Sequence, residues 1–190
     1  MKIYKFLFKT RLNHTNFNIK EVTMNKNYKI AIVGATGVVG RTAIKILEEK
    51  NLPISKYSFF ASKKSAGKNL EFKGTTYQIE ELTENSFDSG FDFAIFSAGG
   101  AISQKFAPIA VSKNCIVIDN SSTFRMNEDV PLVVPEVNPE EILNNHGIIA
   151  NPNCSTIQAV VALKPLDDKY KIKRIVYSTY QAVSGAGKKG

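Results

Sequence analysis

Three regularly spaced glycines constrain the fold of this chain more than any other feature of the sequence. Gly34, Gly37 and Gly40 follow an apolar run at 28–33, and apolar residues recur with helical spacing from 41 to 50. A strand that enters such a loop and a helix that leaves it form a turn suited to a pyrophosphate, because glycines admit the anion and the helix N-terminus attracts it. A purely structural turn is the alternative, but the flanking strand and helix favour a dinucleotide site.

The same alternation of apolar strands and amphipathic helices continues to about residue 150. The patterns predict strands at 57–61, 91–96, 115–118 and 147–150, a hairpin near 71–82, and a helix at 102–113 that Pro108 is expected to kink. They indicate an α/β fold with a Rossmann-like, doubly wound parallel sheet. The expected domains are a disordered basic extension at 1–24, a nucleotide-binding domain at 25–150, and the beginning of an incomplete α+β catalytic or dimerisation domain at 151–190.

The loop after the second predicted strand bears on which dinucleotide is bound. An NAD site usually has Asp or Glu there, to accept a hydrogen bond from the ribose 2′-hydroxyl. This chain has lysines and serines at 62–68 and no acidic residue. Since Lys64 and Ser65 can pair with a 2′-phosphate that a carboxylate would repel, the loop favours NADP over NAD. A solvated lysine-rich loop is the alternative.

Cys154 lies where a strand is predicted to end and a helix, at 155–163, to begin. Asn153 is a favourable N-cap residue, and the helix macrodipole stabilises a thiolate on the first turn. The Asn153 amide and nearby N–H groups can hold an oxyanion that forms when the sulfur attacks a carbonyl. A nucleophilic thiol beside a nicotinamide site predicts an aldehyde or acyl-group oxidoreductase. Cys115, at the start of an apolar strand, is predicted to be a buried structural thiol.

The net charge of +8 does not indicate a nucleic-acid partner. Half of it lies in residues 1–24, and the other lysines are scattered without an RNA-binding motif or zinc-ligand spacing. No apolar run approaches the length of about 18 residues expected of a membrane helix, and no metal ion is expected. The two cysteines do not make a disulfide framework, so a reduced, cytoplasmic setting is predicted. For residues 1–24, organelle targeting and translation from Met24 remain alternatives.

Five segments resemble aspartate-semialdehyde dehydrogenases, in order along the chain. They are GATGVVG at 34–40, the loop at 61–68, VVPEVN at 133–138, PNCST at 152–156 and STYQAVSGAG at 178–187. The resemblance implies NADP-dependent reduction of aspartyl phosphate to aspartate semialdehyde through a cysteine thioester, in the biosynthesis of lysine, threonine and methionine. The substrates would be these small molecules and phosphate, and the full-length enzyme would be a homo-oligomer such as a homodimer.

The resemblance also assigns roles to individual residues. The cofactor would be bound by Gly34, Thr36, Gly37, Val38, Val39, Lys64, Ser65, Ser184 and Gly185. The phosphate and the substrate would be bound by Arg125, Asn153 and Gln181, with Cys154 as the nucleophile. The chain departs from the family at Lys63 and Lys64, where an arginine and small residues are frequent, and at 100–102, where Gly-Ala-Ile replaces a Ser/Thr-rich stretch.

A general base for the thiol is not evident in the sequence. The two histidines are His14, in the basic extension, and His146, at the far end of the strand that leads to Cys154. In the family the base lies downstream of residue 190, so we expect the 190-residue polypeptide to have little or no turnover. Two alternatives are an N-acetyl-glutamyl-phosphate reductase-like enzyme and a non-catalytic NADP-binding paralogue; the retained Cys154 argues against the paralogue.

Overall fold

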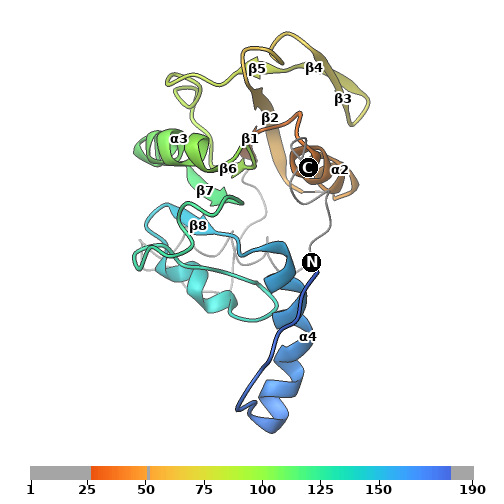
Figure 1. The fold of residues 1–190 in the computed structure, drawn as a ribbon. Coiled ribbons are helices and arrows are strands. Elements are labelled where there is room, and N and C mark those ends of the chain that lie inside the picture. Colours follow the sequence, from red (N-terminus) through yellow and green to blue (C-terminus); the bar gives the residue numbers. More distant parts are fainter. Residues whose placement is uncertain (1–26, 51, 181–190) are drawn as a thin grey trace.

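A parallel sheet forms the centre of the molecule (Figure 1). The computed structural model describes residues 27–50 and 52–180. Six strands hydrogen-bond in the order β5, β2, β1, β6, β7, β8, and every neighbouring pair is parallel. They are β1 (Tyr28–Val33), β2 (Ile54–Ala61), β5 (Glu80–Glu81), β6 (Phe93–Phe96), β7 (Ile116–Asp119) and β8 (Ile148–Ala150). The predicted doubly wound α/β fold is confirmed.

Helices cover both faces of this sheet, so the sheet has two cores (Figure 1). In β1, Ile30 and Ile32 pack with Ile44 and Leu47 of α2 (Val38–Glu49). The alternate residues of β1 face α3 (Gly100–Ser112), on the other side of the sheet. A strand buried on both faces must be apolar throughout, which explains the continuous apolar run that predicted β1.

The helix boundaries differ from the sequence prediction. Helix α2 begins at Val38 and not at 41, because Gly40 lies inside its first turn, packed against the Gly34 carbonyl. Helix α3 begins at Gly100 and continues through Pro108, whose ring is exposed. The predicted hairpin consists of β3 (Asn69–Phe72) and β4 (Thr75–Gln78), which pair outside the main sheet. Strand β2 starts three residues before its predicted position, and β6 starts two residues after its predicted position.

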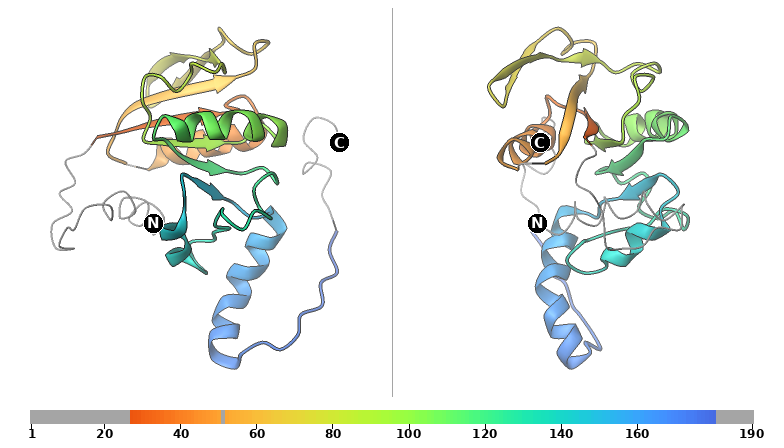
Figure 2. Two further views of the ribbon diagram at one scale, coloured as in Figure 1. Left: turned by 90° about the vertical axis from the view of Figure 1, so that its left-hand side faces the viewer. Right: turned by 180° about the vertical axis from the view of Figure 1, so that it is seen from behind.

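Helix α4 (Cys154–Tyr170) leaves the sheet and extends away from it (Figure 2). It continues through Pro165, seven residues beyond the predicted end at Leu163, and none of its residues is buried. Residues 171–180 follow without regular secondary structure. The 3-10 helix η1 (Pro139–Asn144) precedes β8. Within the described ranges no helix is long and apolar enough to cross a membrane. The expectations for residues 1–24 lie outside the described residues.

Candidate active site

A cavity of about 360 Å³ opens at the carboxyl ends of β1 and β6. Strand β1 is followed through α2 by β2 on one side, whereas β6 and β7 extend the sheet on the other, so the winding direction reverses here. Open α/β sheets bind their ligands at such a switch point, and the volume is within the range of small-molecule sites. The cavity is lined by Val33, Gly34, Thr36, Gly37, Ala61, Ser62, Leu82, Ser97, Ala98, Ile102 and Phe106.

The glycine loop forms one wall of this cavity, as the sequence predicts. Gly34 has φ +88°, and a Cβ atom there would lie 2.7 Å from the carbonyl oxygen of Ser97. Gly37 is the N-cap of α2, and Val38 and Val39 in the first turn are exposed. The first N–H groups of a helix have no acceptor within the helix, so this turn can donate to an anion. The loop therefore fits the pyrophosphate of a dinucleotide.

Arg41 adds a positive charge to this loop that sequence reasoning did not consider. Its Nε donates to the carbonyl oxygen of Thr36 at 3.0 Å, and the first turn of α2 contains no acidic residue. A cation near a helix N-terminus opposes the macrodipole, whereas it favours a bound anion. The sequence could have predicted this charge, because Arg41 directly follows the last glycine of the loop, Gly40.

The end of β2 holds the residues predicted to select the cofactor. Ser62 lines the cavity, and the exposed Lys64 and half-buried Ser65 follow in the next turn. Two carboxylates that the local sequence did not reveal lie nearby, because Glu80 and Glu81 of β5 pair with the last two residues of β2. The charge at this edge of the sheet therefore includes two carboxylates from β5 as well as the lysines at 62–68.

Cys154 is the first residue of α4, and its side chain is exposed. The Asn153 Oδ1 accepts a hydrogen bond from the Ser155 N–H at 2.9 Å, so the predicted N-cap is confirmed. An exposed thiol at a helix N-terminus is accessible to a substrate and lies in the positive end of the macrodipole. Cys115, by contrast, is 1% exposed, as predicted.

Arg125 lies between the loops that follow β7 and β8. Its Nε donates to the Asn151 carbonyl at 2.9 Å and its Nη2 to the Asn120 carbonyl at 3.1 Å. Asn151 is three residues before Cys154, a span of at most about 11 Å of extended chain. Among the described residues, none of the ion pairs includes Arg125. The neutral acceptors orient its guanidinium without balancing its charge.

A buried carboxylate anchors the turn that carries Arg125. Asp119, at the end of β7, is fully buried and accepts hydrogen bonds from the Ser103 hydroxyl at 2.5 Å and the Ser121 hydroxyl at 2.6 Å. Ser121 in turn accepts from the Thr123 N–H at 3.1 Å. Because Ser103 belongs to α3, whose Ile102 lines the cavity at the ends of β1 and β6, this network joins that cavity to the turn that carries Arg125.

His146 is not brought to Cys154. It is exposed and precedes β8 at the end opposite to Asn151, so the structure supports its prediction as a loop residue. Gln181, Ser184 and Gly185 lie outside the described residues.

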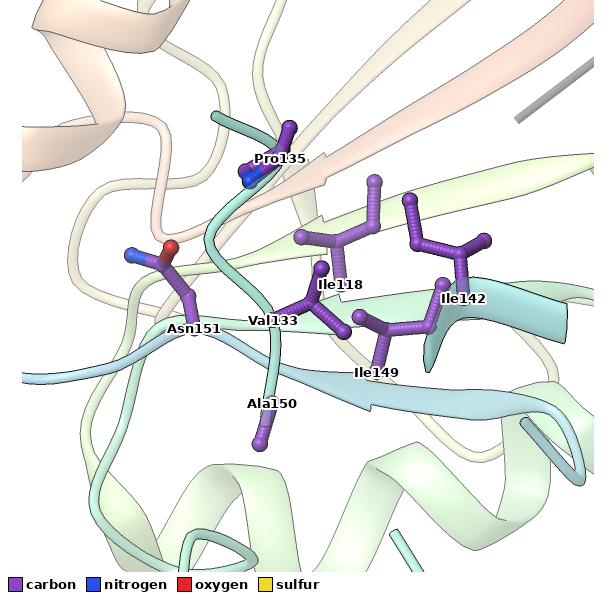
Figure 3. Close-up of a pocket in the computed structure, with 7 residues that line it drawn as sticks. All are labelled: Ile118, Val133, Pro135, Ile142, Ile149, Ala150 and Asn151. Carbon is purple, nitrogen blue, oxygen red and sulfur yellow. The ribbon is translucent and has the colours of Figure 1, made fainter. Parts of the chain in front are cut away.

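A second, smaller cavity lies under the segment that follows residue 131 (Figure 3). It measures about 30 Å³ and is lined mainly by aliphatic side chains, among them Ile118, Ile142 and Ile149. It is too small for a dinucleotide and has few polar partners to offer. In Figure 3 the Asn151 amide points away from the isoleucines. This cavity is a packing gap between the sheet and the segment that covers it.

Comparison with known proteins gives a consistent set of relatives. Residues 29–145 match the model of the family "Semialdehyde dehydrogenase, NAD binding domain". An aspartate-semialdehyde dehydrogenase of Aquifex aeolicus is 60% identical over 165 residues, which are 85% of this chain and 48% of that protein. The chain thus spans about half the length of the curated relatives it matches.

Solved structures of similar proteins agree with these relatives. The crystal structure of aspartate semialdehyde dehydrogenase II from Vibrio cholerae complexed with ASA has a TM-score of 0.82 at 49% identity, over 87% of this chain and 49% of that one. An aspartate semialdehyde dehydrogenase with NADP from Candida albicans has a TM-score of 0.67 at 27% identity, over 76% of this chain and 48% of that one.

Proposed function

The chain belongs to the semialdehyde dehydrogenase family, and on that premise we propose that it binds NADP and supplies the nucleophile of an aspartate-semialdehyde dehydrogenase. The observation that carries this proposal is the arrangement at one edge of the sheet. The dinucleotide cavity at the ends of β1 and β6 lies at the same edge as Arg125, after β7, and Cys154, after β8. Carboxyl ends of parallel strands share one edge, so cofactor, anion-binding and thiol groups face the same region.

NADP is the proposed cofactor. The glycine loop and the first turn of α2 would hold the pyrophosphate, and Lys64 and Ser65 would bind the 2′-phosphate. Ser184 and Gly185 are assigned to the same cofactor by resemblance. The NADP complex of the Candida albicans relative supports this choice. Glu80 and Glu81 do not exclude it, since both carboxylates are exposed to solvent that screens their charge.

Cys154 is the proposed nucleophile in the reduction of aspartyl phosphate. Its sulfur attacks the acyl carbon, the carbon–oxygen bond to phosphate breaks, and phosphate leaves as an acyl thioester forms. The Asn153 Nδ2 and the first-turn N–H groups other than that of Ser155, which bonds the Asn153 Oδ1, would stabilise the oxyanion of the addition step. When bound, NADPH would supply the hydride for reduction of the thioester, in which the carbon–sulfur bond breaks and the Cys154 thiolate is released with the semialdehyde.

Arg125 is the proposed ligand of the phosphate group, because its charge is oriented but is not paired with any carboxylate of residues 27–50 and 52–180. Gln181 is assigned to the substrate by resemblance. No described histidine reaches Cys154, so we also propose that the 190-residue polypeptide alone turns over slowly or not at all. A homo-oligomeric enzyme that acts in the cytoplasm is part of the same proposal.

Two measurements on the chain test this function without requiring turnover. Titration of NADPH, followed by its fluorescence, should show saturable binding that NADP displaces. Incubation with aspartyl phosphate, or with acetyl phosphate as a more stable analogue, should leave an acyl group on Cys154 that hydroxylamine removes. A Cys154→Ser variant should bind NADPH normally and give no hydroxylamine-sensitive adduct. Lack of binding up to millimolar NADPH, or an equal adduct on Cys115, would refute the proposal.

A further inference from the structure

The loops that follow β7 and β8 are joined by a pair of asparagine side chains. The Asn151 Nδ2 donates to the Asn120 Oδ1 at 2.5 Å. Both residues are half-buried, and the main chain of each is fixed by the sheet, since the Asn120 N–H donates to Phe96 and the Asn151 N–H to Asp119. The amide pair therefore connects two rigid strand ends.

Arg125 completes this connection into a closed ring. Its Nε and Nη2 donate to the main-chain carbonyls of the same two asparagines, Asn151 and Asn120. We refer to Arg125, Asn120 and Asn151 as the asparagine clasp. A long, flexible side chain held at two points on two loops loses most of its rotational freedom before any ligand arrives, and such preorganisation favours binding.

The clasp contains one charge and no counter-charge. Carbonyl and amide oxygens satisfy the geometry of guanidinium donors, but they are neutral. The nearest buried carboxylate along the chain, Asp119, is occupied by the hydroxyl groups of Ser103 and Ser121. A guanidinium oriented only by neutral acceptors attracts an anion more strongly than one already paired with a carboxylate.

We propose that Asn120 and Asn151 are positioning residues that hold the Arg125 guanidinium next to the Cys154 thiol, so that an anionic group bound by Arg125 lies beside the sulfur. This inference rests on the proposed function for the role of Arg125 as the phosphate ligand. Asn151 serves both ends of the arrangement, because its carbonyl holds Arg125 and its chain continues within three residues to Cys154. Loss of the amide pair would remove a side-chain bond between the two loops, so that the direction of the carbonyls that hold Arg125 would depend on the sheet alone.

Charge-selective alkylation of Cys154 tests this arrangement directly. Iodoacetate carries a carboxylate and iodoacetamide does not, so the ratio of their rate constants reports whether a cation is positioned beside the thiol. Peptide mapping assigns the label to Cys154, and N-acetylcysteine gives the ratio of a free thiol. In the unaltered chain we expect a ratio about tenfold above that of the free thiol, as a fixed neighbouring charge produces. Phosphate should abolish the excess.

Asn120→Ala and Asn151→Ala should each lower this ratio toward the free-thiol value, which Arg125→Gln is expected to reach. Both variants keep the carbonyls that Arg125 bonds but remove the amide pair between them. The rate with iodoacetamide reports the thiolate fraction, which a neighbouring cation also raises, so the ratio of the two rate constants is the quantity compared between variants. If the two amides act through their mutual bond, the double variant should be no worse than either single one. Asn144→Ala is the matched control, because within the described part of the chain that amide bonds Glu141 alone, on η1, and its ratio should stay unchanged.

The inference is overturned if the unaltered chain shows the free-thiol ratio, or if Arg125→Gln lowers the ratio and neither asparagine variant does. Should the alanine variants fail to fold, Asn151→Ser removes the hydrogen bond between the two side-chain amides while keeping a polar side chain. Its iodoacetate-to-iodoacetamide ratio then tests the inference in the same way. The alkylation assay contains no cofactor. A failure to bind NADPH would therefore count against the proposed function but not against the positioning role of Asn120 and Asn151.

Discussion

The parallel sheet and helix α4 belong to one chain but are stabilised in different ways. The sheet is buried on both faces by α2 and α3, and its largest side chains, such as Phe59 and Phe96, are fully buried. Helix α4 buries no residue, and Leu166 and Tyr170 on it are largely exposed. Cys154 lies at the junction of the two regions. The difference indicates that the cavity at the ends of β1 and β6 lies within a well-packed region, whereas Cys154 begins a helix with no buried residue.

Truncation of a core side chain in the sheet should give the largest effect. Phe59 is fully buried and contacts the rings of Phe72 and Tyr77 at centroid distances of 5.4 and 5.2 Å. Phe59→Ala should lower the free energy of unfolding in urea by about 3–5 kcal/mol. Leu166→Ala on α4 should change it by less than about 1 kcal/mol. Similar losses for the two variants would break the comparison between the regions.

Substitution of the first glycine of the loop should have the next largest effect. Gly34→Ala places a Cβ atom 2.7 Å from the Ser97 carbonyl at φ +88°, so we expect a loss of about 3 kcal/mol together with loss of NADPH binding. Gly67→Ala is the control, because Gly67 has φ +82° but no atom within 4 Å of the position that a Cβ atom would take. It should cost about 1 kcal/mol. Equal costs would mean that the close approach to Ser97 does not matter.

Cofactor preference should depend on the turn after β2. Lys64→Glu should weaken NADPH binding about tenfold or more, because a cation near the 2′-phosphate is replaced by an anion, and should change NADH binding much less. Fluorescence titration with both cofactors measures this. Lys45→Glu, an equal change of charge on the exposed face of α2, is the control. Equal weakening of both cofactors by Lys64→Glu would remove this residue from the 2′-phosphate site.

Loss of the cap of α4 should give the smallest effect and should stay local. Asn153→Ala removes the acceptor of the Ser155 N–H, which costs a helix about 1 kcal/mol. Faster hydrogen exchange in the first turn of α4 and slower alkylation of Cys154 are expected, with NADPH affinity unchanged. A parallel fall in NADPH affinity would show that the two regions are coupled more tightly than their packing indicates.

Local patterns predicted the sheet well because its signals are local. Strand β1 is an apolar run, and the glycine spacing follows from a turn between adjacent elements. The predicted start of α2 was wrong because Gly40 was assigned to the loop, whereas it lies in the helix, in contact with the Gly34 carbonyl. The end of α4 was wrong because hydrogen bonds from Lys171 and Ile172 to Asp167 hold the last turn beyond Pro165.

The parts of the site that the sequence did not predict are long-range. Glu80 and Glu81 reach the end of β2 only because β5 pairs with that strand. The bonds of Arg125 to Asn120 and Asn151 depend on the order of β7 and β8 in the sheet. No local pattern reports such neighbours, whereas the N-cap role of Asn153 was predictable because it involves adjacent residues.

The central claim is that the region from β1 to β8 forms the main part of the dinucleotide site, to which Ser184 and Gly185 add contacts. Fluorescence titration of NADPH against the 190-residue chain and against a polypeptide of residues 27–153 tests this claim most directly. Saturable binding to both, with the shorter polypeptide weaker by no more than about tenfold because it lacks Ser184 and Gly185, is the predicted result. Binding to the longer chain alone, or to neither, would contradict it.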